Sequence, residues 1–96
     1  MIHEIATITI DPAQAAEFES AVGKAQPHFE AARGFISFSL QKSIENPGRY
    51  LLIVGWESVD AHMIDFRNSE GFQTWRTLVG KYFGSPPSVE HTQIVI

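Results

Sequence analysis

Cysteine is absent from this chain of 96 residues, so it has neither a disulfide framework nor a thiolate for chemistry. The sequence also lacks a glycine-rich phosphate loop and a pair of histidines at metal-ligand spacing. We therefore expect no cofactor, whether flavin or haem, and no metal. No apolar run approaches the ~20 residues of a transmembrane helix, and no basic and apolar leader precedes the first strand, so a cytoplasmic location with no membrane contact is expected.

Positive charge is scarce, with 7 Lys and Arg against 11 Asp and Glu and a formal net charge of -4. The basic residues are scattered along the chain, so no surface is predicted for a polyanion and no nucleic acid is expected as a partner. A hydrophobic fraction of 44% is ordinary for a globular protein and indicates one domain over residues 1–96. A core of this size is often reinforced by dimerisation.

The apolar stretch from Tyr50 to Val54 is the part of the sequence around which the rest is arranged. It is too short for a helix, rich in branched residues, and bounded by the turn residues 46–48 and by Ser58. We interpret it as a central strand that is apolar on both faces. The chain's own helices cover one face, and we expect a second subunit to cover the other.

Periodicity and capping residues assign the remaining segments. In chain order these are a strand over 2–10, a helix from the Asp11 cap to Gly34, a strand over 35–44 with Ile36 and Phe38 on its apolar face, two helices between Ser58 and Phe83 that break at Ser69, and a strand over 89–96. The order βαββ(αα)β predicts an α+β, ferredoxin-like fold with an antiparallel four-stranded sheet.

A set of short motifs occurs in a fixed order along nearly the whole chain: Pro47-Gly48-Arg49-Tyr50, Trp56-Glu57-Ser58, His62, Phe66-Arg67-x-Ser69, Phe72, Trp75 and Pro87-x-Val89-Glu90-His91. Together they resemble the antibiotic biosynthesis monooxygenase (ABM) domain family. The resemblance implies a homodimer in which two sheets pack face to face as a dimeric α+β barrel, with a pocket between sheet and helices in each subunit. Members of that family oxidise polyketide anthrones to quinones, degrade haem, or have signalling or unknown roles.

The resemblance implies a cofactor-independent monooxygenase, an oxidoreductase acting on a small aromatic or polyketide-like substrate such as an anthrone or quinol. A deprotonated anthrone is able to reduce dioxygen itself, so the protein need supply only an apolar cavity, a base and donors to an oxyanion. Haem degradation is not expected, because the stretches that hold its residues in the family offer Ala6, Asp65 and the neighbourhood of Arg76. The alternative function is a non-catalytic dimeric module that binds a small molecule or only assembles.

The candidate catalytic residues are His62 and His91. His62 follows Trp56 by six residues and should lie beside an apolar wall, which keeps an imidazole neutral because burial disfavours the cation. We expect His62 at the end of the sheet where the first strand begins, whereas His91 enters the last strand from the opposite end. A pocket with either histidine pointing into it favours the enzyme, and a filled core with both on the surface favours the module.

Arg67 is a candidate donor to a substrate oxyanion, the alternative being a surface or dimer salt bridge. The other candidates for substrate binding are aromatic, and each of them is also suited to plain core packing. They are Phe38, Tyr50, Trp56, Phe66, Trp75 and Phe83.

Overall fold

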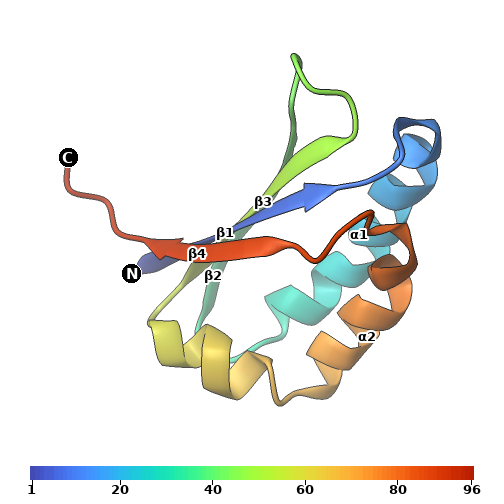
Figure 1. Ribbon diagram of the computed structural model, residues 1–96. Helices are drawn as coiled ribbons and strands as arrows, with labels where there is room; N and C mark the ends of the chain where they lie inside the picture. The colour runs from blue at the N-terminus through green and yellow to red at the C-terminus, as the bar shows by residue number, and fades with distance from the viewer.

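The computed structural model describes all 96 residues. Its strands and main helices are β1 (Ile2–Thr9), α1 (Ala15–Glu30), β2 (Phe35–Lys42), β3 (Arg49–Trp56), α2 (Glu70–Val79) and β4 (Ser88–Thr92), with short helices η1 (Pro12–Gln14), η2 (Ala61–Phe66) and η3 (Gly80–Tyr82). The strands form one antiparallel sheet in the order β2-β3-β1-β4, and α1 and α2 lie on the same side of it (Figure 1). The predicted α+β fold is thereby confirmed. None of the helices is both long and apolar enough to cross a lipid bilayer.

The caps at the starts of the helical segments are those that the sequence predicts, whereas α1 ends at Glu30 and not at the predicted Gly34. The carboxylate of Asp11 accepts a hydrogen bond from the N–H of Ala13 at 2.9 Å, and the hydroxyl of Ser69 accepts one from the N–H of Phe72 at 3.3 Å. Beyond the end of α1, Gly34 has a φ of 82°, in the left-handed region that favours glycine. These local signals fix where the chain leaves each helix and returns to the sheet.

The central strand β3 has the two-faced character that its sequence predicts. Leu52, Val54 and Trp56 face the helices and are at most 1% exposed, and they pack in a core built around Phe29 of α1. Alternate residues such as Ile53 face the opposite side of the sheet and are half-buried. No segment of the chain packs as a layer over that opposite side (Figure 1).

Two strands differ from the prediction at their ends. A bulge between Phe35 and Ser37 in β2 turns Phe35 toward the core and leaves Ile36 44% exposed, so the prediction of Ile36 on the apolar face is wrong. β4 ends at Thr92, and residues 93–96 run away from the sheet as an exposed tail (Figure 1). The register of β4 against β1 pairs His91 with Glu4.

Candidate functional site

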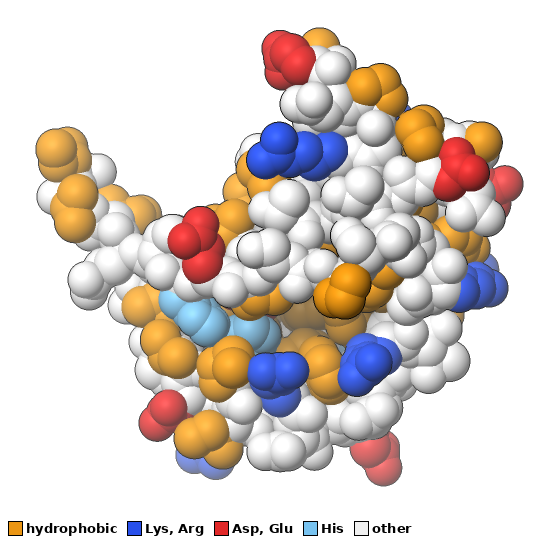
Figure 2. Space-filling view, in the orientation of Figure 1, with side chains coloured by type: hydrophobic (Ala, Val, Ile, Leu, Met, Phe, Trp, Pro, Cys, Tyr) orange, Lys and Arg blue, Asp and Glu red, His pale blue; other side chains and the backbone are white.

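A cavity of about 900 Å³ lies between the β1 and β4 edge of the sheet and the helical segments η2 and α2. Figure 2 shows this face of the molecule, with hydrophobic, histidine and Lys or Arg side chains gathered around a hollow. The apolar part of the lining comes from Ala6, Ile8, Leu52, Met63, Phe72, Trp75, Phe83, Pro86, Pro87 and Val89. The cavity is large enough for a small polycyclic molecule.

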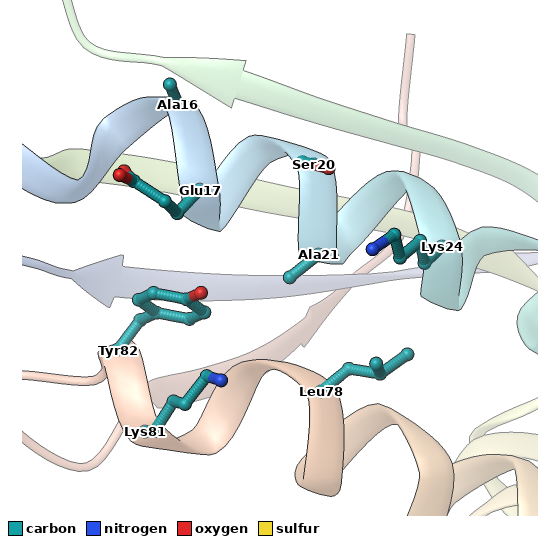
Figure 3. A pocket seen from close by; sticks show the side chains of 8 residues that line it. All are labelled: Ala16, Glu17, Ser20, Ala21, Lys24, Leu78, Lys81 and Tyr82. Atoms are coloured by element: carbon teal, nitrogen blue, oxygen red, sulfur yellow. The ribbon is translucent and has the colours of Figure 1, made fainter.

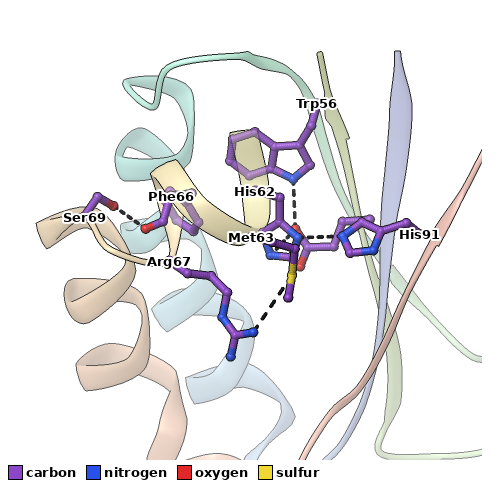
Figure 4. Close-up of polar contacts among 8 residues, drawn as sticks. Trp56, His62, Met63, Phe66, Arg67, Ser69 and His91 are labelled. Atoms are coloured by element: carbon purple, nitrogen blue, oxygen red, sulfur yellow. Dashed lines mark hydrogen bonds and ion pairs between the residues drawn. The ribbon is translucent and has the colours of Figure 1, made fainter. Parts of the chain in front are cut away.

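Three titratable side chains form a continuous line of close polar contacts along one end of this cavity. One carboxylate oxygen of Glu4, Oε1, lies 3.3 Å from Nε2 of His62, and Nδ1 of His62 lies 2.9 Å from Nε2 of His91. The indole N–H of Trp56 donates to the same Glu4 oxygen at 3.0 Å. Figure 4 shows His62 between Trp56 and His91. We refer to Glu4, His62 and His91 as the Glu–His–His chain.

Strand register and an unusual helical turn bring the three residues together. Glu4 and His91 are direct partners on the neighbouring strands β1 and β4, and both face the helices. His62 comes from η2, a π-helical segment in which the N–H of Arg67 donates to the C=O of His62 at 3.1 Å, five residues back. Such wide turns are rare and occur frequently at functional sites.

Burial sets the charge states of the two inner members. Glu4 is 5% exposed, and this burial raises the pKa of its carboxyl to about 7 although the Trp56 hydrogen bond and the Arg67 charge favour ionisation. His62 is also 5% exposed, and burial, with the charges of His91 and Arg67, lowers its pKa to about 4. His62 stacks on the Trp56 indole with ring centroids 5.6 Å apart. It is therefore a neutral imidazole near pH 7, beside a carboxyl that titrates there.

His62 lies between the Glu4 carboxyl and the His91 imidazole, and a neutral histidine in such a place can carry a proton from one group to the other. When Glu4 is ionised, the proton of His62 is on Nε2, 3.3 Å from the carboxylate, and Nδ1 accepts from His91. When Glu4 is protonated, the proton of His62 is on Nδ1, which donates to His91. The change from the first arrangement to the second moves a proton from the His91 end to Glu4.

The sequence-predicted site residues fall into two groups. Five of them line the cavity: His62, His91, Arg67, Trp75 and Phe83. The other four do not line it and lie against the core: Phe38, Tyr50, Trp56 and Phe66. The hydroxyl of Tyr50 points to α1 instead, where it donates to the Glu19 carboxylate at 2.6 Å, while Trp56 holds Glu4.

The prediction that His91 lies at the opposite end of the sheet from His62 is wrong. It assumed a last strand that continues to residue 96, which would put His91 near the strand's beginning. The register of β4 pairs Ser88 with Thr7 and His91 with Glu4, so His91 lies near the end of the sheet where β1 begins. It is half-buried, and its Nδ1 makes no hydrogen bond within the protein.

Sequence reasoning missed Glu4, which holds the inner end of the line. The signal was present, because the alternate residues of β1 that face the helices are otherwise apolar, as Ala6 and Ile8 are. A charged residue in an apolar series of this kind is seldom buried without a partner. Arg76, a second basic residue at the cavity, was also missed.

Other parts of the molecule offer no comparable site. An open groove of about 440 Å³ runs between α1 and the α2–η3 segment (Figure 3), and its lining holds no buried titratable group. Its residues are Ala16, Glu17, Ser20, Ala21, Lys24, Leu78, Lys81 and Tyr82. No three side chains of the His, Cys, Asp and Glu types converge as metal ligands, since Glu4, His62 and His91 lie in a line.

Comparison with known proteins gives matches along the whole chain. The sequence pattern of the family described as antibiotic biosynthesis monooxygenase matches residues 1–78. The Bacillus subtilis protein YczJ, which is uncharacterised, is 37% identical over 95 residues, covering 99% of this chain and all of YczJ.

Solved structures match as well. A Bordetella bronchiseptica protein provisionally named an antibiotic biosynthesis monooxygenase is 52% identical, with a TM-score of 0.96 over 99% of this chain and 97% of that one. A variant of SnoaB, a cofactor-independent oxygenase from Streptomyces nogalater, is 20% identical, with a TM-score of 0.81 over 99% of this chain and 93% of that one. At that identity SnoaB supports the fold alone.

Proposed function

The chain belongs to the antibiotic biosynthesis monooxygenase family, and from this premise we propose that it oxidises a small aromatic, polyketide-like substrate with dioxygen and without a cofactor. An anthrone or quinol oxidised to a quinone is the reaction type. The observation that carries the proposal is the Glu–His–His chain, whose half-buried end at His91 lines a largely apolar cavity. This arrangement supplies a base where an apolar substrate would lie.

In the first step the substrate loses a proton from its activated C–H group to Nδ1 of His91. The proton on Nε2 of His91 passes to Nδ1 of His62, and the proton on Nε2 of His62 passes to Glu4, across contacts of 2.9 and 3.3 Å. The charge on Glu4 is neutralised and both histidines end neutral. Arg67, which lines the same cavity, stabilises the oxyanion of the resulting carbanion–enolate.

In the second step the carbanion reduces dioxygen and a C–O bond forms, giving a peroxide anion. The Glu–His–His chain returns its proton to the outer peroxide oxygen. Cleavage of the O–O bond, with loss of the remaining hydrogen on that carbon, gives the carbonyl and one water. For an anthrone the balance is substrate plus dioxygen to anthraquinone plus water, so the substrate supplies the electrons.

The test is oxygen uptake with a panel of anthrones and hydroquinones. We expect His91→Ala to lower kcat/KM by about 10²–10⁴, the usual loss for removal of a general base. His62→Ala should lower it comparably, because the line to Glu4 is cut. His28→Ala is the matched control, since His28 is exposed on α1 and outside the cavity. Retention of uptake within about threefold by both site variants would contradict the assignment.

The alternative is a non-catalytic module of the same fold. This alternative is favoured if no member of the panel supports oxygen uptake by the native protein while aromatic compounds still bind in the cavity. We also propose that the protein acts as a homodimer, with the open face of the sheet covered by a second copy. The support is the set of half-buried apolar residues on that face, including Ile5, Leu51 and Ile53.

A further inference from the structure

Two arginines line the cavity, and neither is paired with a carboxylate. The one ion pair of a lysine or arginine is Lys42 with Glu19, and the carboxyl of Glu4 contacts the neutral His62, which leaves Arg67 and Arg76 without an acidic partner. This is notable in a chain with 11 acidic residues and a net charge of -4. A basic cavity in an acidic protein runs against the overall charge.

The two arginines differ in how they are held. The guanidinium of Arg67 lies over the Phe72 ring, 5.7 Å from its centroid, and contacts the sulfur of Met63 at 3.9 Å (Figure 4). Arg76, on α2, makes no hydrogen bond, ion pair or stacking contact with any other side chain. The residues one helical turn away from it are Phe72, Gln73, Val79 and Gly80, none of them acidic. Its five N–H donors are therefore free for a ligand.

The arginines also differ in position relative to the Glu–His–His chain. Arg67 directly follows η2, the segment that carries His62, whereas Arg76 lies within α2, farther along the chain. The aromatic side chains of Phe72 and Trp75 line the cavity on the same helix as Arg76. The single acid in the lining, Glu4, is buried and already engaged by Trp56 and His62.

We propose that the cavity selects an aromatic anion, a planar ring system whose carboxylate pairs with Arg76 while its reactive carbon lies beside His91. A planar guanidinium and a carboxylate form paired, charge-assisted hydrogen bonds, and the exposed side chain of Arg76 in the cavity lining is open to such a partner. The inference rests on the proposed function for its identification of the cavity as the substrate site. The inference adds a substrate class to the proposed function, namely acidic rather than neutral aromatic compounds.

The test compares two probes of nearly the same shape, anthraquinone-2-carboxylate and anthraquinone-2-carboxamide, by calorimetric titration at about pH 8, where free histidines are neutral. We expect the carboxylate to bind the native protein about two- to fivefold more tightly than the amide, the scale of one exposed ion pair. Arg76→Gln should remove that difference. Arg33→Gln, which deletes an exposed arginine outside the cavity, should retain it. Raised salt should weaken only the carboxylate.

Equal affinities for the two probes, or no binding of either up to millimolar concentration, would overturn the inference. A preference for the carboxylate that Arg76→Gln leaves unchanged would also overturn it. Because binding is measured without turnover, this result is separable from the oxygenase proposal. A carboxylate preference that depends on Arg76, with no oxygen uptake from any substrate, would retain the acidic ligand class and reject the reaction.

Discussion

At the residue scale, Glu4 and His62 form a buried acid–base pair that folding converts from charged to neutral. Between about pH 4.5 and 6.5, the ordinary pKa values of the two groups, an unfolded chain has an ionised glutamate and a protonated histidine. In the folded protein the pKa of Glu4 is raised to about 7 and that of His62 is lowered to about 4, so over the same range both are neutral. Folding thus moves one proton from His62 to Glu4, and the pair takes up no net proton.

This exchange predicts how stability depends on pH. The contribution of Glu4, whose folded pKa is raised, is present at low pH and lost as pH rises from 4.5 through about 7. The contribution of His62, whose folded pKa is lowered, is lost as pH falls from 6.5 toward about 4. The two slopes are opposite in sign, so in the native protein they cancel between 4.5 and 6.5.

Single substitutions should reveal the pH dependence of the free energy of unfolding that each group contributes and that cancels in the native protein. In Glu4→Gln only the histidine remains, so we expect the free energy of unfolding to rise with pH between about 4 and 6.5, beyond the native trend. In His62→Leu only the carboxyl remains, and the free energy of unfolding should fall as pH rises from 4.5 to about 7. Each change is on the order of 3 kcal/mol for a pKa difference of this size. Urea unfolding at several pH values measures both.

The charges of Arg67 and His91 face the pair in all three proteins and do not explain opposite slopes. If both variants showed the same pH slope as the native protein, the neutral buried pair would be refuted.

At the element scale, the packing of the turn after α1 against the start of η2 positions His62. Gly34 has a φ of 82°, and a Cβ added there would lie 2.7 Å from the Cβ of Ala61, the first residue of η2. Its C=O also accepts the N–H of Glu57 at 2.8 Å, which ties the end of β3 to the same turn. The π-helical turn that carries His62 therefore depends on a glycine 28 positions away in sequence (62 minus 34).

We expect Gly34→Ala to lower the free energy of unfolding by about 1–3 kcal/mol, from backbone strain and the displacement of Ala61. Gly80→Ala is the matched control, because nothing lies within 4 Å of its added Cβ and its φ of -58° is helical. That change should be neutral or slightly stabilising. Urea unfolding of both variants measures the change in the free energy of unfolding. An equal decrease in the two variants would contradict the role of Gly34.

Sequence patterns predicted the elements better than they predicted their junctions. The caps at Asp11 and Ser69 and the two-faced strand through Leu52 follow from local chemistry and were confirmed. The contact between His62 and His91 was not predictable, because it depends on the register of β4 against β1 and on a π-helical turn. Neither feature leaves a periodic signal, since both are decided by packing between segments far apart in sequence.

At the scale of the whole molecule, the sheet has one face under helices and one face with no cover from the chain. The open face carries Ile5 on β1 and Leu51 and Ile53 on β3, neighbours across the strand pair and all half-buried. Beyond β4, the tail exposes Ile94, Val95 and Ile96 by 65, 88 and 111%. An apolar sheet face and an apolar tail of this kind favour burial against another copy.

We predict a homodimer in which two open faces pack together, burying in total at least about 1,000 Å², the lower range for a stable interface. Light scattering at micromolar concentration should give twice the chain mass of 10.7 kDa. Ile53→Glu puts a charge in the centre of the open face and should yield a folded monomer. Ile64→Glu makes the same change at a 54%-exposed residue of η2, on the helical side, and should leave the dimer intact. A native mass of 10.7 kDa under these conditions would refute face-to-face packing, because the apolar face would then remain in water.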